Sequence, residues 1–294
     1  MQHVARASEL AAHADVVLEN YKVGQLKKYG LDYDALKAVK PDLIYCSITG
    51  FGQTGPYASR PGFASIAESM GGVAAISGQP GGEPMLPAFA LTDEVTGLVG
   101  AFATMVALHS GKGQVVDVSL LESIFHLMGP LMSVWLTRGE MQERLGSGIP
   151  YTVPRGVYRC SDGRYVGISA SSDSIAARVV ALLGFEGDER FTTFGARVEN
   201  REVLDGAMRD WCAARTQEEV LAQMSDADAA AGPIMTMEDI ANDPHYAARD
   251  AIIKVDGTPM QGIIAKLSTT PGAVRWRGRP RNADGEHIRQ HGWD

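Results

Sequence analysis

Residues 42–50 read Asp-Leu-Ile-Tyr-Cys-Ser-Ile-Thr-Gly, a short apolar run that enters a glycine-rich loop. Such a run, bounded by Pro41 and Gly50, predicts a buried strand over residues 42–48. Residues 33–39 before it have a helical pattern, and Val16-Val17-Leu18 predicts another buried strand after a helix at 3–13. Because helices and strands alternate, we expect a parallel sheet.

The same alternation continues downstream. Helices are predicted at 64–70, 92–109 and 119–137, with a strand at 115–118. This order is typical of an α/β fold with a doubly wound sheet.

A second domain is predicted after Gly146, where glycine and proline interrupt the pattern. An Asp162-Gly163 turn between two apolar runs predicts a hairpin, because Asp-Gly accepts the backbone of a tight turn. Thr216 and Glu219 match a capping box at the start of a helix. We therefore predict a large domain at 1–145, a small α+β domain at 146–250, and a return linker and tail at 251–294. From residue 268 onward we expect irregular chain.

Composition limits the classes of function. The chain has 294 residues, 45% of them hydrophobic, and a formal net charge of -8, which argues against nucleic acid or an anionic membrane as partner. A small metabolite fits better. The three cysteines are too few for a disulfide framework or a zinc site, and the N-terminus does not resemble a signal peptide. We expect a cytoplasmic protein without a metal.

The candidate for chemistry is Asp93, within Leu-Thr-Asp-Glu-Val-Thr-Gly at residues 91–97. It lies at a predicted helix start, where free backbone amides favour negative charge. Glycine-rich segments on both sides would let a ligand approach the backbone closely. An aspartate at a helix start is also a common cap, so the residues alone leave both interpretations open.

Several motifs together resemble the class III coenzyme A transferases, the carnitine dehydratase and bile-acid-inducible protein family. In chain order they are residues 15–21, 50–57, 60–63, 93–97, 111–119, 244–246 and 285–287. The resemblance implies a Rossmann-like large domain, an interlocked homodimer, and CoA bound as an acyl-CoA substrate beside a carboxylic acid. It implies that Asp93 is the nucleophile, forming an anhydride and then an aspartyl-CoA thioester, and Gly52 and Gly55 are candidate oxyanion donors.

The resemblance also assigns residues to CoA. They are Asn20, Tyr21, Lys22, Lys28, Arg60, Pro61, Gly62 and Phe63. The alternative for Lys22 and Lys28 is a strand end with two solvated lysines. Phe63 stands where the racemase branch of the family needs a histidine, and phenylalanine cannot exchange a proton. A racemase is therefore the minor alternative. Residues 146–156 do not resemble the glycine-rich tetrad of the oxalate-specific formyl-CoA transferases, so we expect a succinyl-CoA-like donor or another short dicarboxylate.

Relative to the family pattern, on the order of 70 residues that form a first strand, a loop and a further βα unit are expected before Ala14 and are absent. Two classes of function follow. One is a CoA-transferase for a short acyl-CoA and a carboxylic acid, and the other is a truncated, non-catalytic binding or assembly subunit.

Overall fold

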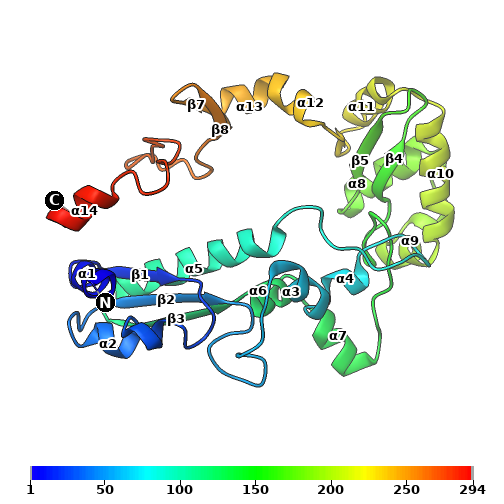
Figure 1. Ribbon diagram of the computed structural model, residues 1–294. Coiled ribbons are helices and arrows are strands. Elements are labelled where there is room, and N and C mark those ends of the chain that lie inside the picture. The colour runs from blue at the N-terminus through cyan, green and yellow to red at the C-terminus, as the bar shows by residue number, and fades with distance from the viewer. Residues whose placement is uncertain (1, 293–294) are drawn as a thin grey trace. The chain divides into compact units, whose positions relative to one another are not determined.

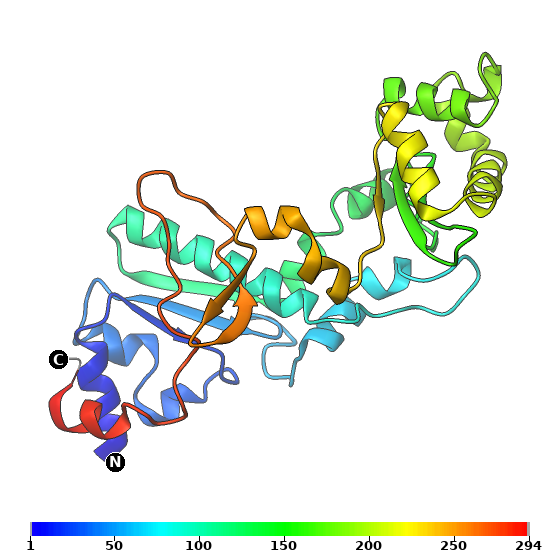
Figure 2. The same ribbon diagram turned by 90° about the horizontal axis from the view of Figure 1, so that it is seen from above.

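The computed structural model describes residues 2–292 of the chain. They form two compact units, residues 2–146 with Gly292 and residues 147–291 (Figures 1 and 2). The division follows Gly146, next to the predicted domain boundary, and residues 251–291 group with the second unit. The assignment of 251–294 as a return linker stays a prediction.

The first unit is built on a parallel sheet of three strands in the order β1-β2-β3. These are β1 (Val16–Glu19), β2 (Ile44–Thr49) and β3 (Gln114–Ser119). Its helices are α1 (Gln2–Ala11), η1 (Leu26–Tyr29), α2 (Tyr33–Lys37), α3 (Ala64–Met70), α4 (Val73–Ile76), α5 (Leu91–Ser110), α6 (Leu120–His126) and α7 (Leu131–Arg138). The predicted parallel α/β architecture is confirmed.

Strand β2 explains why helices cover both faces of this sheet. Successive side chains of a strand point to opposite faces. Ile44 and Cys46 are buried in one core with Ala107 of α5, whereas Tyr45 is buried in a second core with Leu36 of α2. Figure 1 accordingly shows α5 and α2 on opposite sides of the sheet.

The predicted single helix over 119–137 is wrong. The chain forms α6 and α7, whose axes are bent by 73°. Gly129, with φ 55°, and Pro130, the N-cap of α7, separate them. A left-handed glycine ends a helix, and a proline starts the next one because it has no N–H to donate.

Helix α5 has the length and apolar composition of a membrane span, and the bent α6–α7 pair would match if it were one span. Among residues 2–292, α5 and the α6–α7 pair are the candidate membrane spans by length and composition. A core helix of a soluble protein has the same length and composition. Here α5 packs against the sheet through Ala103 and Ala107. Its Gly100 lies against Ile48, where a Cβ would approach that side chain to 3.3 Å.

The second unit contains an antiparallel sheet in the order β4-β5-β6 and a separate hairpin, β7-β8. The strands are β4 (Arg155–Arg159), β5 (Tyr165–Ser169), β6 (Ala231–Pro233), β7 (Ile252–Val255) and β8 (Thr258–Gln261). The helices are α8 (Asp173–Leu182), η2 (Glu189–Phe191), α9 (Phe194–Glu199), α10 (Arg201–Ala213), α11 (Gln217–Asp226), α12 (Met237–Asn242), α13 (Pro244–Ala248) and α14 (Gly285–His291).

Gly232 and Pro233 belong to β6, and Pro233 is tolerated there because β6 is an edge strand. One difference from the sequence prediction occurs in this unit. The segment after residue 268 is not irregular throughout, since α14 forms within it.

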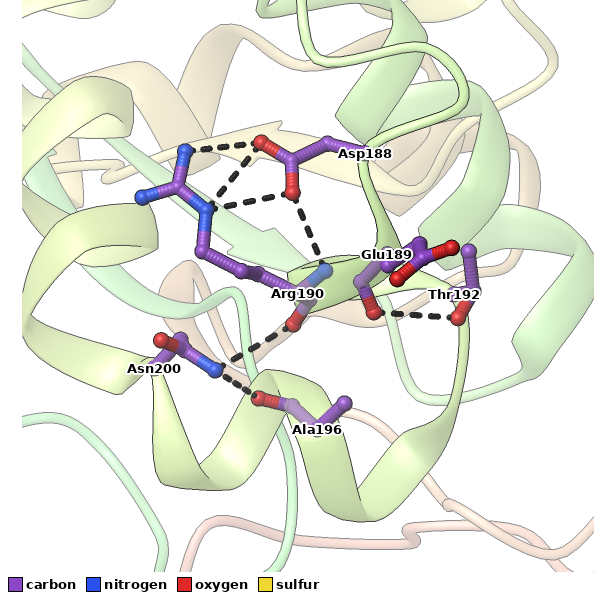
Figure 3. Close-up of polar contacts among 6 residues, drawn as sticks. All are labelled: Asp188, Glu189, Arg190, Thr192, Ala196 and Asn200. Carbon is purple, nitrogen blue, oxygen red and sulfur yellow. Dashed lines mark hydrogen bonds and ion pairs between the residues drawn. The ribbon is translucent and has the colours of Figure 1, made fainter.

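Side-chain caps define several helix starts in the second unit. Thr216 and Glu219 form the predicted capping box, with the Thr216 N–H donating to Glu219 at 2.7 Å. Figure 3 shows the start of η2, where Asp188 accepts from the backbone N–H of Arg190 at 3.0 Å and from its guanidinium at 2.7 Å. The side-chain amide of Asn200 donates to the Arg190 carbonyl and so ties η2 to the following helix.

Candidate active site

A cavity of about 780 Å³ in the first unit lies at the carboxyl ends of the three parallel strands. Asn20 follows β1, Gly50 follows β2 and Leu120 follows β3, and all three line it. The carboxyl edge of a parallel sheet is where open α/β folds place their ligands. The volume is within the usual range for small-molecule sites.

Two glycines allow the loops of this cavity to cross. A Cβ on Gly50 would lie 2.7 Å from the Cα of Gly62, and a Cβ on Gly62 would lie 2.8 Å from the Cα of Gly50. Both residues line the cavity. The Gly50 carbonyl also accepts from the N–H of Leu121, so the crossing is fixed to the start of α6. Any larger residue at either position would move the cavity wall.

The glycine-rich loop after Gly50 is held by the sheet beneath it. Gly52 N–H donates to the hydroxyl of Thr49 at 3.0 Å, and Gln53 N–H donates to both oxygens of Asp117 at 3.0 and 3.2 Å. In this structure the N–H of Gly52 is thus bonded to Thr49 of β2, and the oxyanion role of Gly52 stays a prediction. Gly55 is not among the residues that line the cavity.

Asp93 is the third residue of α5 and lines the cavity with an exposed side chain. The N-cap of α5 is Ala90, which makes no side-chain cap hydrogen bond. Asp93 therefore does not cap the helix, and within residues 2–292 its carboxylate has no hydrogen bond or ion pair. Glu94, the next residue, is exposed and lies outside the cavity lining. Asp93 is thus a carboxylate available to a ligand.

Two cations line the same cavity. Neither Lys22 nor Arg60 forms an ion pair with a described residue, and the Arg60 guanidinium carbon lies 4.1 Å from the ring centroid of Tyr57. Such stacking orients a guanidinium and leaves its N–H groups free for an anion. The cavity therefore combines unpaired positive charge with the carboxylate of Asp93.

Most of the predicted CoA contacts meet at this cavity. Those that line it are Asn20, Tyr21, Lys22, Arg60, Pro61, Gly62 and Phe63. Lys28 does not line it, and its side chain is exposed on η1. Phe63, the N-cap of α3, is 71% exposed and presents an aromatic ring at the wall.

Other lining residues were not predicted from the sequence. The loop 86–90 adds an apolar wall that includes Leu86 and Phe89. Glu68 of α3 lines the cavity although it is only 3% exposed, and it accepts a hydrogen bond from the hydroxyl of Thr92 at 2.9 Å. The one sequence signal for Glu68 is a charge inside an otherwise uncharged helix.

Metal ligands are not grouped anywhere in residues 2–292: no three His, Cys, Asp or Glu side chains there are placed to share an ion. That the reaction needs no metal stays a prediction.

Comparison with known proteins identifies the family. The family model "CoA-transferase family III" matches residues 2–287. Succinyl-CoA–D-citramalate CoA-transferase of Chloroflexus aurantiacus is 36% identical, over 97% of this chain and 73% of the relative. Succinate–glutarate CoA-transferase of Agrobacterium fabrum is 34% identical, over 97% of this chain and 74% of the relative.

Comparison with solved structures supports the same family assignment. A CAIB/BAIF family protein from Brucella suis superposes with a TM-score of 0.83 at 36% identity, covering 98% of this chain and 78% of that one. Rv3272 from Mycobacterium tuberculosis gives a TM-score of 0.81 at 27% identity, covering 93% of this chain and 74% of that one. The chain belongs to CoA-transferase family III and is a CoA-transferase, an enzyme that exchanges CoA between an acyl-CoA and a carboxylic acid.

Proposed function

We propose that this enzyme transfers CoA from a short, succinyl-CoA-like donor to a carboxylic acid acceptor, with Asp93 as the nucleophile. The observation that carries the proposal is the unpaired carboxylate of Asp93 at the wall of a cavity that also presents Lys22 and Arg60. The choice of donor is supported by the names of relatives such as succinyl-CoA–D-citramalate CoA-transferase.

The proposed reaction has four balanced steps. A carboxylate oxygen of Asp93 attacks the thioester carbonyl and CoA leaves as thiolate, which gives a mixed anhydride. The thiolate attacks the aspartyl carbonyl of the anhydride and releases the donor acid, leaving an aspartyl-CoA thioester. The acceptor carboxylate attacks this thioester and expels the thiolate again. The thiolate then attacks the acceptor carbonyl of the new anhydride, which releases acceptor-CoA and the Asp93 carboxylate.

The cavity wall suggests how CoA is held. Lys22 and Arg60 would bind phosphate groups, because both are unpaired cations at the cavity. Asn20 would hydrogen-bond the cofactor, and Tyr21 and Phe63 would pack against adenine or pantetheine, since both rings are more than half exposed. Lys28, on η1 and outside the cavity lining, remains a proposed phosphate contact.

The test is CoA transfer from succinyl-CoA to a panel of dicarboxylates, compared between the wild type and Asp93→Asn. We expect transfer by the wild type and a loss of at least about a thousandfold in the variant, as for removal of a covalent nucleophile. Glu94→Gln is the matched control, because Glu94 is the neighbouring exposed acid outside the cavity. Quenching with hydroxylamine should leave a hydroxamate on the peptide that carries Asp93.

Equal transfer by Asp93→Asn would refute the assignment of the nucleophile. No transfer by the wild type with any donor would favour the non-catalytic binding subunit. A racemase would instead exchange the hydrogen next to the thioester with solvent, and Phe63 at the cavity wall supplies no proton for that reaction.

We also propose that the enzyme is an interlocked homodimer and that a second copy covers α5. Leu98, Phe102, Met105 and Val106 repeat at helical spacing and are each more than half exposed. Light scattering after gel filtration should give twice the chain mass, and Phe102→Lys should shift it toward the monomer. A monomeric wild type would refute this proposal.

A cytoplasmic location is proposed as well. The structure keeps Cys46, Cys160 and Cys212 as free, buried thiols, as expected in a reducing compartment. Fractionation of cells that express the tagged chain would test this, and recovery in a membrane or exported fraction would contradict it.

A further inference from the structure

Glu68 is a buried carboxylate that the reaction steps do not use. It is 3% exposed, and within the described residues it forms no ion pair. The partner that the structure gives it is the hydroxyl of Thr92, which is itself fully buried. Burying a carboxyl group with a single hydroxyl partner is unfavourable compared with an apolar side chain of similar size. Packing alone therefore does not account for glutamate at this position.

The bond from Thr92 reaches the first turn of α5, where Leu91 packs against the apolar core but the N-cap residue makes no side-chain hydrogen bond. The first amides of a helix have no partner inside the helix, and a side chain at the N-cap usually supplies one. In α5 the N-cap is Ala90, and no side chain caps this end. Thr92 is the second residue of the helix and directly precedes Asp93. The Thr92–Glu68 hydrogen bond thus joins the first turn of α5 to α3, across the packing between these helices.

We infer that Glu68 is a positioning residue, which fixes the first turn of α5 through Thr92 and thereby holds Asp93 toward the cavity. This inference rests on the proposed role of Asp93 as the nucleophile. The Asp93 carboxylate must approach the thioester carbon of the bound acyl-CoA within a narrow range of distances and angles. A misplacement of about 1 Å can lower the rate on the order of a hundredfold. Because the N-cap of α5 makes no side-chain hydrogen bond, the Thr92–Glu68 bond is the polar side-chain contact that joins this first turn to α3.

Three substitutions distinguish the effect of the Thr92–Glu68 hydrogen bond from the effect of the negative charge of Glu68. Glu68→Gln keeps the shape and an oxygen that accepts from Thr92, Glu68→Leu removes the acceptor, and Thr92→Val removes the donor at nearly equal volume. We expect Glu68→Leu and Thr92→Val each to lower kcat about 10- to 100-fold with KM for the acyl-CoA little changed. Glu68→Gln should retain most of the wild-type kcat. The double variant Glu68→Leu/Thr92→Val should lose no more than either single variant, because both remove the same bond.

Thr104→Val is the matched control. Thr104 lies on the same helix, and its buried hydroxyl has no hydrogen-bond partner, so this variant removes a hydroxyl without removing a bond. It should keep wild-type kcat.

Hydrogen exchange followed by mass spectrometry gives a readout that does not depend on activity. Amide exchange in the peptide that covers residues 91–97 should be at least about tenfold faster in Glu68→Leu and Thr92→Val than in the wild type, Glu68→Gln and Thr104→Val. Unchanged exchange in Thr92→Val would overturn the inference. So would a loss of kcat in Glu68→Gln equal to that in Glu68→Leu, since the charge would then act on the substrate. If the wild type transfers no CoA, the proposed function fails and the exchange data alone decide whether Glu68 anchors α5.

Discussion

The crossing of Gly50 and Gly62 gives a prediction with a clear steric basis. In Gly50→Ala the new Cβ would lie 2.7 Å from the Cα of Gly62 and 3.3 Å from its carbonyl carbon. Carbon atoms in contact normally stay about 3.5–4.0 Å apart. The two loops must therefore separate by roughly 1 Å, and backbone is on both sides of the contact. Gly50 is not among the glycines with positive φ, so crowding is the cause, not a forbidden backbone conformation.

The expected cost is that of an overpacked contact, about 1–3 kcal/mol in the free energy of unfolding. This should lower the melting temperature of the transition that belongs to the first unit by about 2–4 °C for each kcal/mol. Because Gly50 and Gly62 both line the cavity, CoA transfer should also fall by up to about a hundredfold. Scanning calorimetry and the transfer assay measure the two effects.

The matched control is Gly97→Ala. Gly97 lies within α5, and a Cβ there meets no atom within 4 Å. Alanine is favoured over glycine in a helix by up to about 1 kcal/mol, so this variant should be as stable as the wild type or more stable. Wild-type stability together with wild-type transfer in Gly50→Ala would refute the reasoning, since the loops would then separate at no cost.

Three further predictions concern the second unit. Thr216→Ala should lower the free energy of unfolding by about 1 kcal/mol at neutral pH, measured by urea titration, because the N-cap of α11 is lost. The N–H and hydroxyl of Thr216 hold the pKa of Glu219 below its usual value of 4.5, so the part of the stabilisation that comes from the ionised Glu219 is complete above that value and is lost as the pH falls through the lower folded-state pKa. The gap in stability between the wild type and Thr216→Ala should therefore narrow in acid, and a constant gap would contradict this. Burial raises the pKa of the Cys160 thiol and raises that of Cys212 to about 12, so both should react with a thiol reagent only after unfolding.

The parallel sheet could be predicted from the sequence because the signals for β1 and β2 are local. The run Leu43-Ile44-Tyr45-Cys46 is apolar on both faces and buried, as is typical of a strand covered by helices on both sides, whereas Leu18 of β1 is 63% exposed. The predicted helix over 119–137 failed where the apolar pattern continues across Gly129 and Pro130. Periodicity describes which face is apolar, whereas the backbone of these two residues decides where the helix stops.

Strand β6 could not be found locally. Its residues, Ala231 to Pro233, have weak strand propensity, and they form a strand because they pair with β5, more than sixty residues earlier in the chain.

The part of the site that could be predicted from the sequence is the set of residues that directly follow the parallel strands. Asn20, Gly50 and Leu120 meet at one cavity because the parallel strands that they follow end at one edge of the sheet, and Asp93 joins them from the first turn of α5. Glu68 was missed because its burial and its bond to Thr92 depend on how α3 packs against α5. Sequence spacing within one helix contains no information about a contact 24 residues away.

Strand β2 has a further consequence for how this protein can misfold. If β2 paired with its neighbours one residue out of register, Tyr45 would turn toward α5, Ile44 would turn toward α2, and every volume in the two cores would be mismatched. The same slip would move Gly50 by about 3.3 Å along the strand direction, away from Gly62. A mispaired sheet therefore cannot assemble the cavity, so a form of this enzyme with that pairing error would be inactive even where its helical content looked normal.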